Sequence, residues 1–174
     1  VLTAKGYPVA SIDSFWIIET VIHVNVYLGK KYNWLKLSTA GIEKRALEAA
    51  GYRENNFTNK VLNLQQLENL QQRILNFYER QGYPFASVFL DSVHIIEDKI
   101  EGSLSVNKSV LYKIDSIRVI GKVKINNKFL QHYLLIPNGS VYNKDKLSDI
   151  DKRILELPFL TAIQPSDLTM LGSG

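Results

Sequence analysis

The chain has 174 residues, of which 45% are hydrophobic and 22% charged, and its formal net charge at pH 7 is +4. This composition is typical of a folded protein rather than a disordered one, and the length suits one ordinary domain or two small ones. No cysteine is present, which excludes disulfides, thiolate metal sites and cysteine nucleophiles, and no apolar run approaches the about 20 residues that a membrane-spanning helix needs.

The first elements predict a β-hairpin with strands over residues 9–18 and 20–28. In the second stretch apolar residues alternate with polar ones from Ile22 to Leu28, which is typical of a strand with one buried face. The sequence begins without the features of a signal peptide. We therefore expect a piece of a longer protein, in which residues 1–31 are the C-terminal hairpin of a preceding unit.

The middle of the chain, residues 32–111, predicts one complete unit in the order strand, helix, helix, strand, strand. Its clearest element is an amphipathic helix, in which apolar residues recur every three or four positions. Asn63 and Gln66 make a capping pair at the start of this helix, while Gly82 and Pro84 end it. The expected elements are a strand over 32–37, helices over 41–50 and 64–81, and strands over 85–97 and 100–106.

The remaining residues, 112–174, predict a further unit that lacks its closing strand. The expected elements are a strand over 113–120, helices over 127–136 and 143–157, and a strand over 159–171. Incomplete units leave strand edges without partners. We therefore expect one or both ends of the chain to self-associate through strand exchange or edge-to-edge contact.

A repeated hexapeptide connects these units. Gly6 begins GYPVAS and Gly82 begins GYPFAS, 76 positions later, and the stretch after Gly29 resembles the stretch after Ser109, 80 positions later. A fixed spacing of this kind indicates a tandem structural unit of about 75–80 residues. We interpret each hexapeptide as the end of a helix and the start of a strand, and not as a catalytic loop.

The order of the elements and the residues at the unit boundary resemble the POTRA repeats of outer-membrane β-barrel assembly proteins of the BamA and TamA kind. The resemblance departs at Ser109, where the family usually has glycine. It implies an α+β fold of tandem POTRA modules, each a β-α-α-β-β unit with two helices on one face of a three-stranded sheet. The residues that carry it are Phe77-Tyr78 before Gly82-Tyr83-Pro84, the hairpin ending near Val106, Ile114–Gly121, Gly139 with Tyr142, and Leu155–Phe159.

The resemblance also implies a non-enzymatic, cofactor-free role at the periplasmic face of the outer membrane of a Gram-negative bacterium. Modules of this family receive unfolded outer-membrane polypeptides and accessory assembly proteins, ahead of a C-terminal membrane β-barrel. An open sheet edge can pair with an extended peptide through backbone groups, whatever the peptide sequence. The strand after Gly-Tyr-Pro is the usual edge, so the candidate binding residues are Phe85, Ser87, Phe89, Asp91 and Val93.

A basic stretch in the last unit is a second candidate site. Six lysine or arginine residues between positions 108 and 128 face one acidic residue, Asp115. Such a stretch either attracts phosphate groups of nucleic acid or anionic lipid, or is a solvated surface. The candidate basic strip consists of Lys113, Arg118, Lys122, Lys124 and Lys128.

No pattern in the sequence predicts a catalytic or metal site. His23, His94 and His132 lack a second ligand at metal spacing, and neither a nucleophile elbow nor a glycine-rich phosphate loop is present. Two alternatives to β-barrel assembly stay open. One is the POTRA region of a two-partner secretion transporter, and the other is an RNA-binding α/β module using aromatic and basic residues between 27 and 36, although we expect no nucleic-acid partner.

Overall fold

The computed structural model describes residues 2–121, 125–158, 160 and 164–169. Two compact units emerge from the contacts within the chain. Unit 1 comprises Val1–Phe77 and Ala86–Lys108, and unit 2 comprises Tyr78–Phe85 and Ser109–Gly174. Among the described residues, no helix combines the length and the apolar character needed to cross a membrane.

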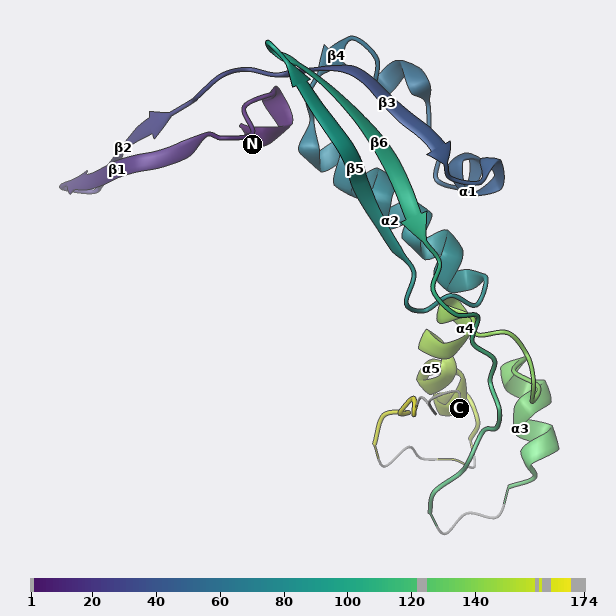
Figure 1. Cartoon of the computed structure of the whole chain (residues 1–174). Helices are drawn as coiled ribbons and strands as arrows, with labels where there is room; N and C mark the ends of the chain where they lie inside the picture. The colour runs from purple at the N-terminus through teal and green to yellow at the C-terminus, as the bar shows by residue number, and fades with distance from the viewer. Residues whose placement is uncertain (1, 122–124, 159, 161–163, 170–174) are drawn as a thin grey trace. The chain divides into compact units, whose positions relative to one another are not determined.

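Unit 1 is built on a four-stranded mixed sheet with the strand order β4-β3-β6-β5 (Figure 1). The first and last long strands of the unit, β3 and β6, run parallel, whereas the β3–β4 and β5–β6 pairs are antiparallel. The two-residue strand β4 is an addition to the three strands that the sequence predicts. The strands span Asn33–Gly41 (β3), Lys60–Val61 (β4), Ser87–Ile96 (β5) and Lys99–Asn107 (β6).

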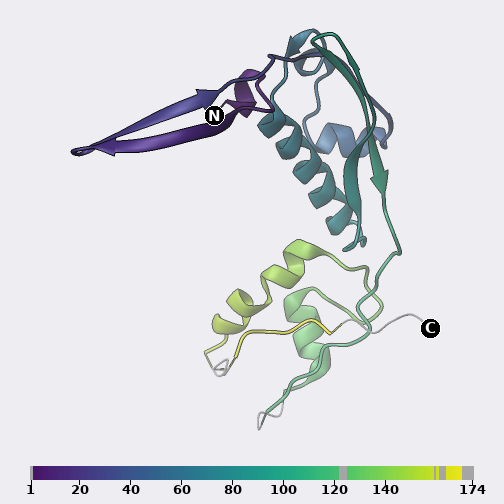
Figure 2. The same cartoon turned by 60° about the vertical axis from the view of Figure 1, so that its left-hand side comes forward.

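Helices α1 (Lys44–Ala49) and α2 (Leu64–Arg80) cover one face of this sheet (Figure 2). The Asn63 side chain accepts a hydrogen bond from the backbone N–H of Gln66 at 3.0 Å, so the predicted cap of α2 is present. Apolar residues from both helices and from β3 and β6 form the core, together with residues of the segment between the two helices. The most buried are Trp34, Leu37, Ala46, Ala50, Phe57, Leu62, Leu70, Ile74 and Leu104.

The predicted N-terminal hairpin is present as a separate two-stranded sheet of β1 (Ser11–Ile18) and β2 (Val21–Tyr27). Its turn begins at Glu19 with φ +54°, as the β5–β6 turn begins at Glu97 with φ +58°. The pairing register places six apolar residues on one face of the hairpin, and all six are exposed. They are Ile12, Phe15, Ile17, Ile22, Val24 and Val26.

Unit 2 contains three short helices, α3 (Asn127–Leu134), α4 (Lys144–Ser148) and α5 (Ile150–Leu155). Helices α3 and α5 are joined by reciprocal bonds, since Arg153 Nη1 donates to the Tyr133 carbonyl at 2.9 Å and the Tyr133 hydroxyl donates to the Arg153 carbonyl at 3.0 Å. The prediction of one helix over 143–157 is wrong. Asp149, with ψ −5°, separates α4 from α5, and aspartate is a poor residue for a helix interior.

The predicted strand over 113–120 forms only an isolated antiparallel bridge between Lys113 and Val141. In unit 1 the corresponding strand β3 is held by a parallel ladder with β6. The described residues after 121 contain no strand, so residues 114–120 have no ladder to join. The predicted strand over 159–171 is likewise absent at residues 160 and 164–169, and its remaining positions lie outside the described residues.

The two hexapeptide copies make the same contact with a tyrosine, which we call the glycine–tyrosine junction. Gly6 and Gly82 have φ of +91° and +98°, in the left-handed region that favours glycine. The backbone N–H of Tyr32 donates to the Gly6 carbonyl at 2.7 Å, and that of Tyr112 donates to the Gly82 carbonyl at 2.8 Å. The hexapeptide is therefore a structural joint in both copies.

Ser109 adopts the left-handed backbone conformation that glycine usually provides. Its φ of +59° is close to the +68° of Gly29, which stands 80 positions earlier. A side chain in this region costs about 1–2 kcal/mol, partly offset by the greater freedom of glycine in the unfolded chain. Ser109→Gly is therefore expected to raise the free energy of unfolding by about 0.5–1 kcal/mol, measured by denaturant titration.

The control for this substitution is Ser109→Ala, which removes the hydroxyl group but keeps Cβ and its backbone strain. It is expected to be no more stable than the parent chain. If glycine and alanine lower the stability equally, contacts of the hydroxyl group outweigh the strain and the expectation is wrong.

Candidate functional site

Strand β5 is one outer edge of the unit 1 sheet, and among the residues that the structure describes its only strand neighbour is β6. The other edge, β4, has two residues, whereas β5 has ten. Strand β5 is therefore the edge that offers unpaired backbone N–H and C=O groups over a length that a peptide can follow. The sequence prediction places its candidate binding residues on this edge.

Three of the five candidate residues share one regular segment of β5. Ser87, Phe89 and Asp91 lie opposite Asn107, Ser105 and Ser103 of β6, so their side chains emerge on the same face of the sheet. On the other face, Leu90 lies opposite the buried Leu104. Phe89 is 45% exposed, so its face offers an apolar contact beside the open edge.

The other two candidates lie off this segment. Val93 falls where the β5–β6 register shifts, between Asp91 and His94. Phe85 precedes the strand and packs edge-on against Tyr112 in unit 2, with ring centroids 5.3 Å apart. The sequence could not reveal this because Phe85 continues the apolar pattern of the strand.

A bulge ends the regular part of the edge. Ser92 has φ +50°, and its backbone N–H donates to the Asp91 carboxylate at 2.8 Å. A β-bulge bends an edge strand and interrupts pairing, so it limits the length over which a further strand can add. The segment before the bulge therefore comprises Ser87–Asp91, half of β5, and contains three of the five candidate residues.

Helix α2 contacts this edge strand through one side chain. The Gln71 amide donates to the Val88 carbonyl at 3.3 Å. This contact holds the start of β5 against the helix. It also means that one backbone carbonyl between Ser87 and Phe89 already has a hydrogen-bond partner.

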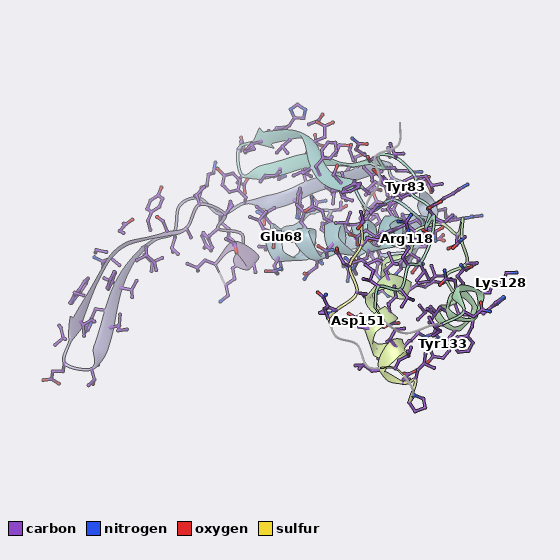
Figure 3. The ribbon with its side chains drawn as sticks, turned by 90° about the horizontal axis from the view of Figure 1, so that it is seen from below. Glu68, Tyr83, Arg118, Lys128, Tyr133 and Asp151 are labelled. Atoms are coloured by element: carbon purple, nitrogen blue, oxygen red, sulfur yellow. The ribbon has the colours of Figure 1, made fainter. Side chains whose placement is uncertain are left out.

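The described residues of the basic strip lie on three different segments of unit 2. Lys113 lies in the bridge to Val141, Arg118 lies in the extended segment that follows, and Lys128 lies on α3. Figure 3 shows Arg118 and Lys128 on separate elements. Lys122 and Lys124 lie outside the described residues.

Three of the described titratable residues make contacts of a structural kind. His23 stacks on Trp16 with ring centroids 5.5 Å apart, and His94 lies opposite Glu101 in the sheet. Burial raises the pKa of the Tyr52 hydroxyl, which donates to the Leu37 carbonyl at 3.2 Å. Within the described part of the chain, no three histidine, aspartate or glutamate side chains gather as a metal site would require.

Unit 1 thus has two helices on one face of a sheet whose first and last long strands run parallel, with a free antiparallel edge strand. This arrangement defines an α+β module of the β-α-α-β-β class. Residues 44–107 match the sequence model of the POTRA family, described as surface antigen variable number repeat. The predicted resemblance to POTRA regions of BamA-like proteins is confirmed for this part of the chain.

Solved structures similar to the chain include POTRA domains 3–5 of Haemophilus influenzae BamA, with a TM-score of 0.62 and 16% identity over 99% of this chain and 71% of that one. This likeness supports the fold. A second is the N-terminal domain of Omp85 from Thermosynechococcus elongatus, with a TM-score of 0.38 and 15% identity over 92% of this chain and 69% of that one. A third is Haemophilus ducreyi BamA lacking POTRA domains 1–3, with a TM-score of 0.43 and 19% identity over 60% of this chain and 20% of that one. No curated protein sequence is significantly similar to the chain.

Proposed function

We propose that the chain is part of the periplasmic region of an outer-membrane protein that assembles or inserts β-barrel proteins. The POTRA domain at residues 44–107 and the fold likeness to BamA POTRA domains support this role. The region acts without catalysis, as a scaffold ahead of a C-terminal membrane β-barrel. Its partners are unfolded outer-membrane polypeptides and accessory assembly proteins.

The module boundaries are part of the same proposal. Residues 1–31 are the closing hairpin of a preceding POTRA module, residues 32–111 are a complete module, and residues 112–174 belong to the following one. The β1–β2 and β5–β6 hairpins support this division, because both turn at a glutamate with positive φ. Self-association through the incomplete end modules stays a prediction.

The proposed binding mode is strand addition at β5, and the observation that carries it is the outermost position of this ten-residue strand. An incoming peptide pairs with the backbone of Ser87–Asp91, where the ladder with β6 is regular. Phe89 contacts the apolar side chains of the peptide. Specificity is low because the backbone groups supply most of the bonds.

A pair of proline substitutions tests this mode. Successive residues of a strand direct their N–H groups to opposite sides, so Val88→Pro and Phe89→Pro remove one N–H from the open edge and one from the ladder with β6. The variant that removes a ladder N–H is expected to have the lower melting temperature, which identifies it. The other variant, which removes an N–H from the open edge, is expected to keep its melting temperature within a few degrees. Its affinity for a labelled unfolded outer-membrane polypeptide is expected to fall by about tenfold or more. Fluorescence anisotropy measures the binding.

Cross-linking supplies a second measurement that does not depend on the proline variants. Because the chain has no cysteine, a single cysteine at Ser87 or Asp91 is expected to form disulfides with a cysteine-bearing peptide. The matched control is Gln72→Cys on the exposed face of α2. Equal cross-linking at the control site, or full binding by both folded proline variants, would show that β5 is not the binding edge.

A further inference from the structure

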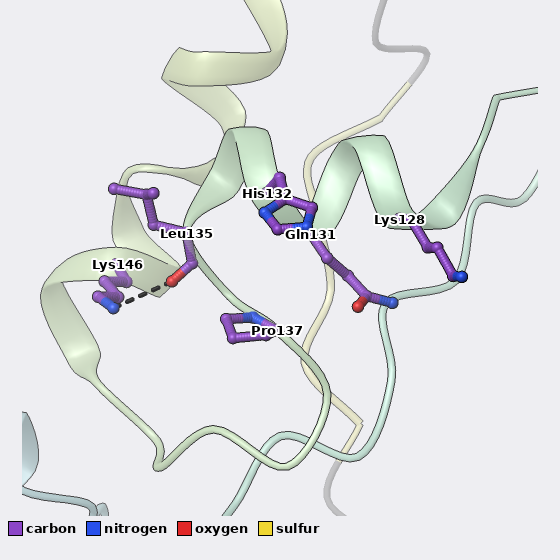
Figure 4. Close-up of a pocket in the computed structure, with 6 residues that line it drawn as sticks. All are labelled: Lys128, Gln131, His132, Leu135, Pro137 and Lys146. Carbon is purple, nitrogen blue, oxygen red and sulfur yellow. Dashed lines mark hydrogen bonds between the residues drawn. The ribbon is translucent and has the colours of Figure 1, made fainter.

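A hollow of about 370 Å³ lies beside α3 in unit 2, and we call it the α3 hollow (Figure 4). Residues of α3 spaced three, four and seven positions apart share one helix face and form one wall, and Lys146 of α4 lies at the opposite end. None of the lining side chains is acidic. The lining residues are Lys128, Gln131, His132, Leu135, Pro137 and Lys146.

Lys146 is held at the rim of the hollow by the end of α3. Its ammonium donates to the Leu135 carbonyl at 3.0 Å, and Leu135 ends the helix with φ +57°. An ammonium group has three N–H donors, so this bond fixes the position of the charge and leaves two donors for a ligand. Among the described residues, neither Lys128 nor Lys146 forms an ion pair.

The middle unit provides an internal comparison, because α1 and α3 end with the same pair of backbone hydrogen bonds. These bonds align the two helices at a spacing of 84 positions. The buried residues correspond as well, since Ala46 aligns with Leu130. The bonds are Gly51 N to Glu48 O and Tyr52 N to Leu47 O in α1, and Leu135 N to His132 O and Ile136 N to Gln131 O in α3.

The starts of α2 and α4 align in the same way. Asn63 accepts from the N–H of Gln66 at 3.0 Å, and Asn143 accepts from the N–H of Lys146 at 3.1 Å. Lys146 therefore takes the place of Gln66, at a spacing of 80 positions.

The alignment shows that the hollow of the last unit lacks the acidic residue of the middle unit. In α1, Lys44 pairs with Glu48 at 3.7 Å. In α3, Lys128 takes the place of Lys44, but His132 takes the place of the acid. With Lys146 in place of Gln66 and Pro137 in place of Arg53, the hollow has the same number of permanent cations as the aligned positions of the middle unit and has lost their one anion.

We propose that the α3 hollow binds a phosphate group carried on a small organic molecule or a lipid headgroup. The lining residues include two lysines, a glutamine and a histidine, whose ammonium, amide and imidazole groups suit an anion with several acceptor oxygens. Leu135 and Pro137 add an apolar wall for the carbon part of the ligand, and the volume lies within the usual range of about 300–1,000 Å³ for ligand sites. This site is separate from β5 and does not depend on the peptide-binding proposal.

Isothermal titration calorimetry of the whole chain with three probes tests the site. The probes are inorganic phosphate, glycerol phosphate, and vesicles of phosphatidylglycerol compared with phosphatidylcholine vesicles. Lys146→Gln and His132→Glu install the residues that stand at the aligned positions of the middle unit, and circular dichroism checks that both variants fold. Each is expected to weaken binding about tenfold, because each removes or neutralises a charge-assisted interaction.

Lys152→Gln is the matched control, since it removes one positive charge from the exposed surface of α5 in the same unit. It is expected to leave the affinity unchanged. Tighter binding of glycerol phosphate than of phosphatidylglycerol vesicles assigns a soluble phosphate ester, and the reverse assigns a lipid headgroup. The proposal is overturned if no probe binds at millimolar concentration, if the control loses as much affinity as the two variants, or if an oligo-aspartate peptide binds while phosphate does not.

Discussion

Replacing Gly82 with alanine is expected to lower the free energy of unfolding by about 2–4 kcal/mol, one of the largest effects of any single methyl group in this chain. A Cβ atom at this position would lie 2.3 Å from Val141 Cγ1 and 2.9 Å from Leu111 Cδ1. The φ of +98° adds strain of its own. Guanidinium titration followed by circular dichroism measures the loss.

Gly139→Ala separates the two causes. Gly139 also has a positive φ, of +77°, but a Cβ atom there would meet nothing within 4 Å. It is expected to lose only the strain energy, about 1 kcal/mol. If both variants lose the same free energy of unfolding, the close contacts of the added methyl group with Val141 and Leu111 make no measurable contribution.

Leu104→Ala is expected to destabilise unit 1 by about 2–5 kcal/mol, because it opens a cavity in the centre of the core. Leu104 is 0% exposed and lies on β6, between β3 and β5. The adjacent substitution Ser103→Ala lies on the other face of the same strand and is expected to change the stability by less than about 0.5 kcal/mol. Thermal unfolding of the three proteins under the same conditions compares these losses.

Val26→Ala extends this comparison to the first hairpin. Val26 follows the turn residue Glu19 at the distance at which Leu104 follows Glu97, yet it is 44% exposed. We expect a loss below about 0.5 kcal/mol in dilute solution, because the side chain remains in contact with water. A loss as large as that of Leu104→Ala would contradict the exposure of this hairpin and would mean that another molecule covers it.

The sequence alone predicts much of unit 1, for physical reasons that particular residues show. Helix α2 has a strong apolar period, a capping asparagine and a terminating Gly82, and the structure places its ends within one residue of the prediction. The β5–β6 hairpin follows from the alternation around a two-residue turn. Each of these signals is local, so one sequence is sufficient to detect it.

The features that the sequence misses depend on distant partners. Strand β4 exists only because Lys60 and Val61 meet Trp34 and Asn33. Residues 113–120 have a strand-like pattern but no ladder, since a strand also needs a neighbour. The sequence pattern predicts Phe85 as part of β5. Its contact with Tyr112 joins residues that are distant in the sequence, so a local pattern does not reveal it.

Only part of the candidate site could be predicted from the sequence, because its other features also depend on residues that are distant in the chain. The resemblance to POTRA modules implied that the strand after Gly-Tyr-Pro is an edge, but the bulge at Ser92 was not visible in the alternation. The α3 hollow was missed because Lys146 lies 18 positions beyond Lys128, outside the basic stretch. Aligning the middle unit with the last unit could have revealed the hollow. In that alignment His132 replaces Glu48, so the sequence alone shows that an acidic residue is lost at a repeated position.

The glycine–tyrosine junction has a practical consequence for dissecting the chain. The repeat in the sequence suggests cutting before Tyr112, yet Tyr78–Phe85 groups with the residues from Ser109 onward. A fragment that begins at residue 112 would lose the Gly82 carbonyl that receives the Tyr112 N–H, and with it the aromatic partner that Phe85 provides. The structural boundary therefore does not coincide with the repeat boundary in the sequence. A fragment that contains the last module should also include residues 78–85, which form the end of α2 and the segment after it.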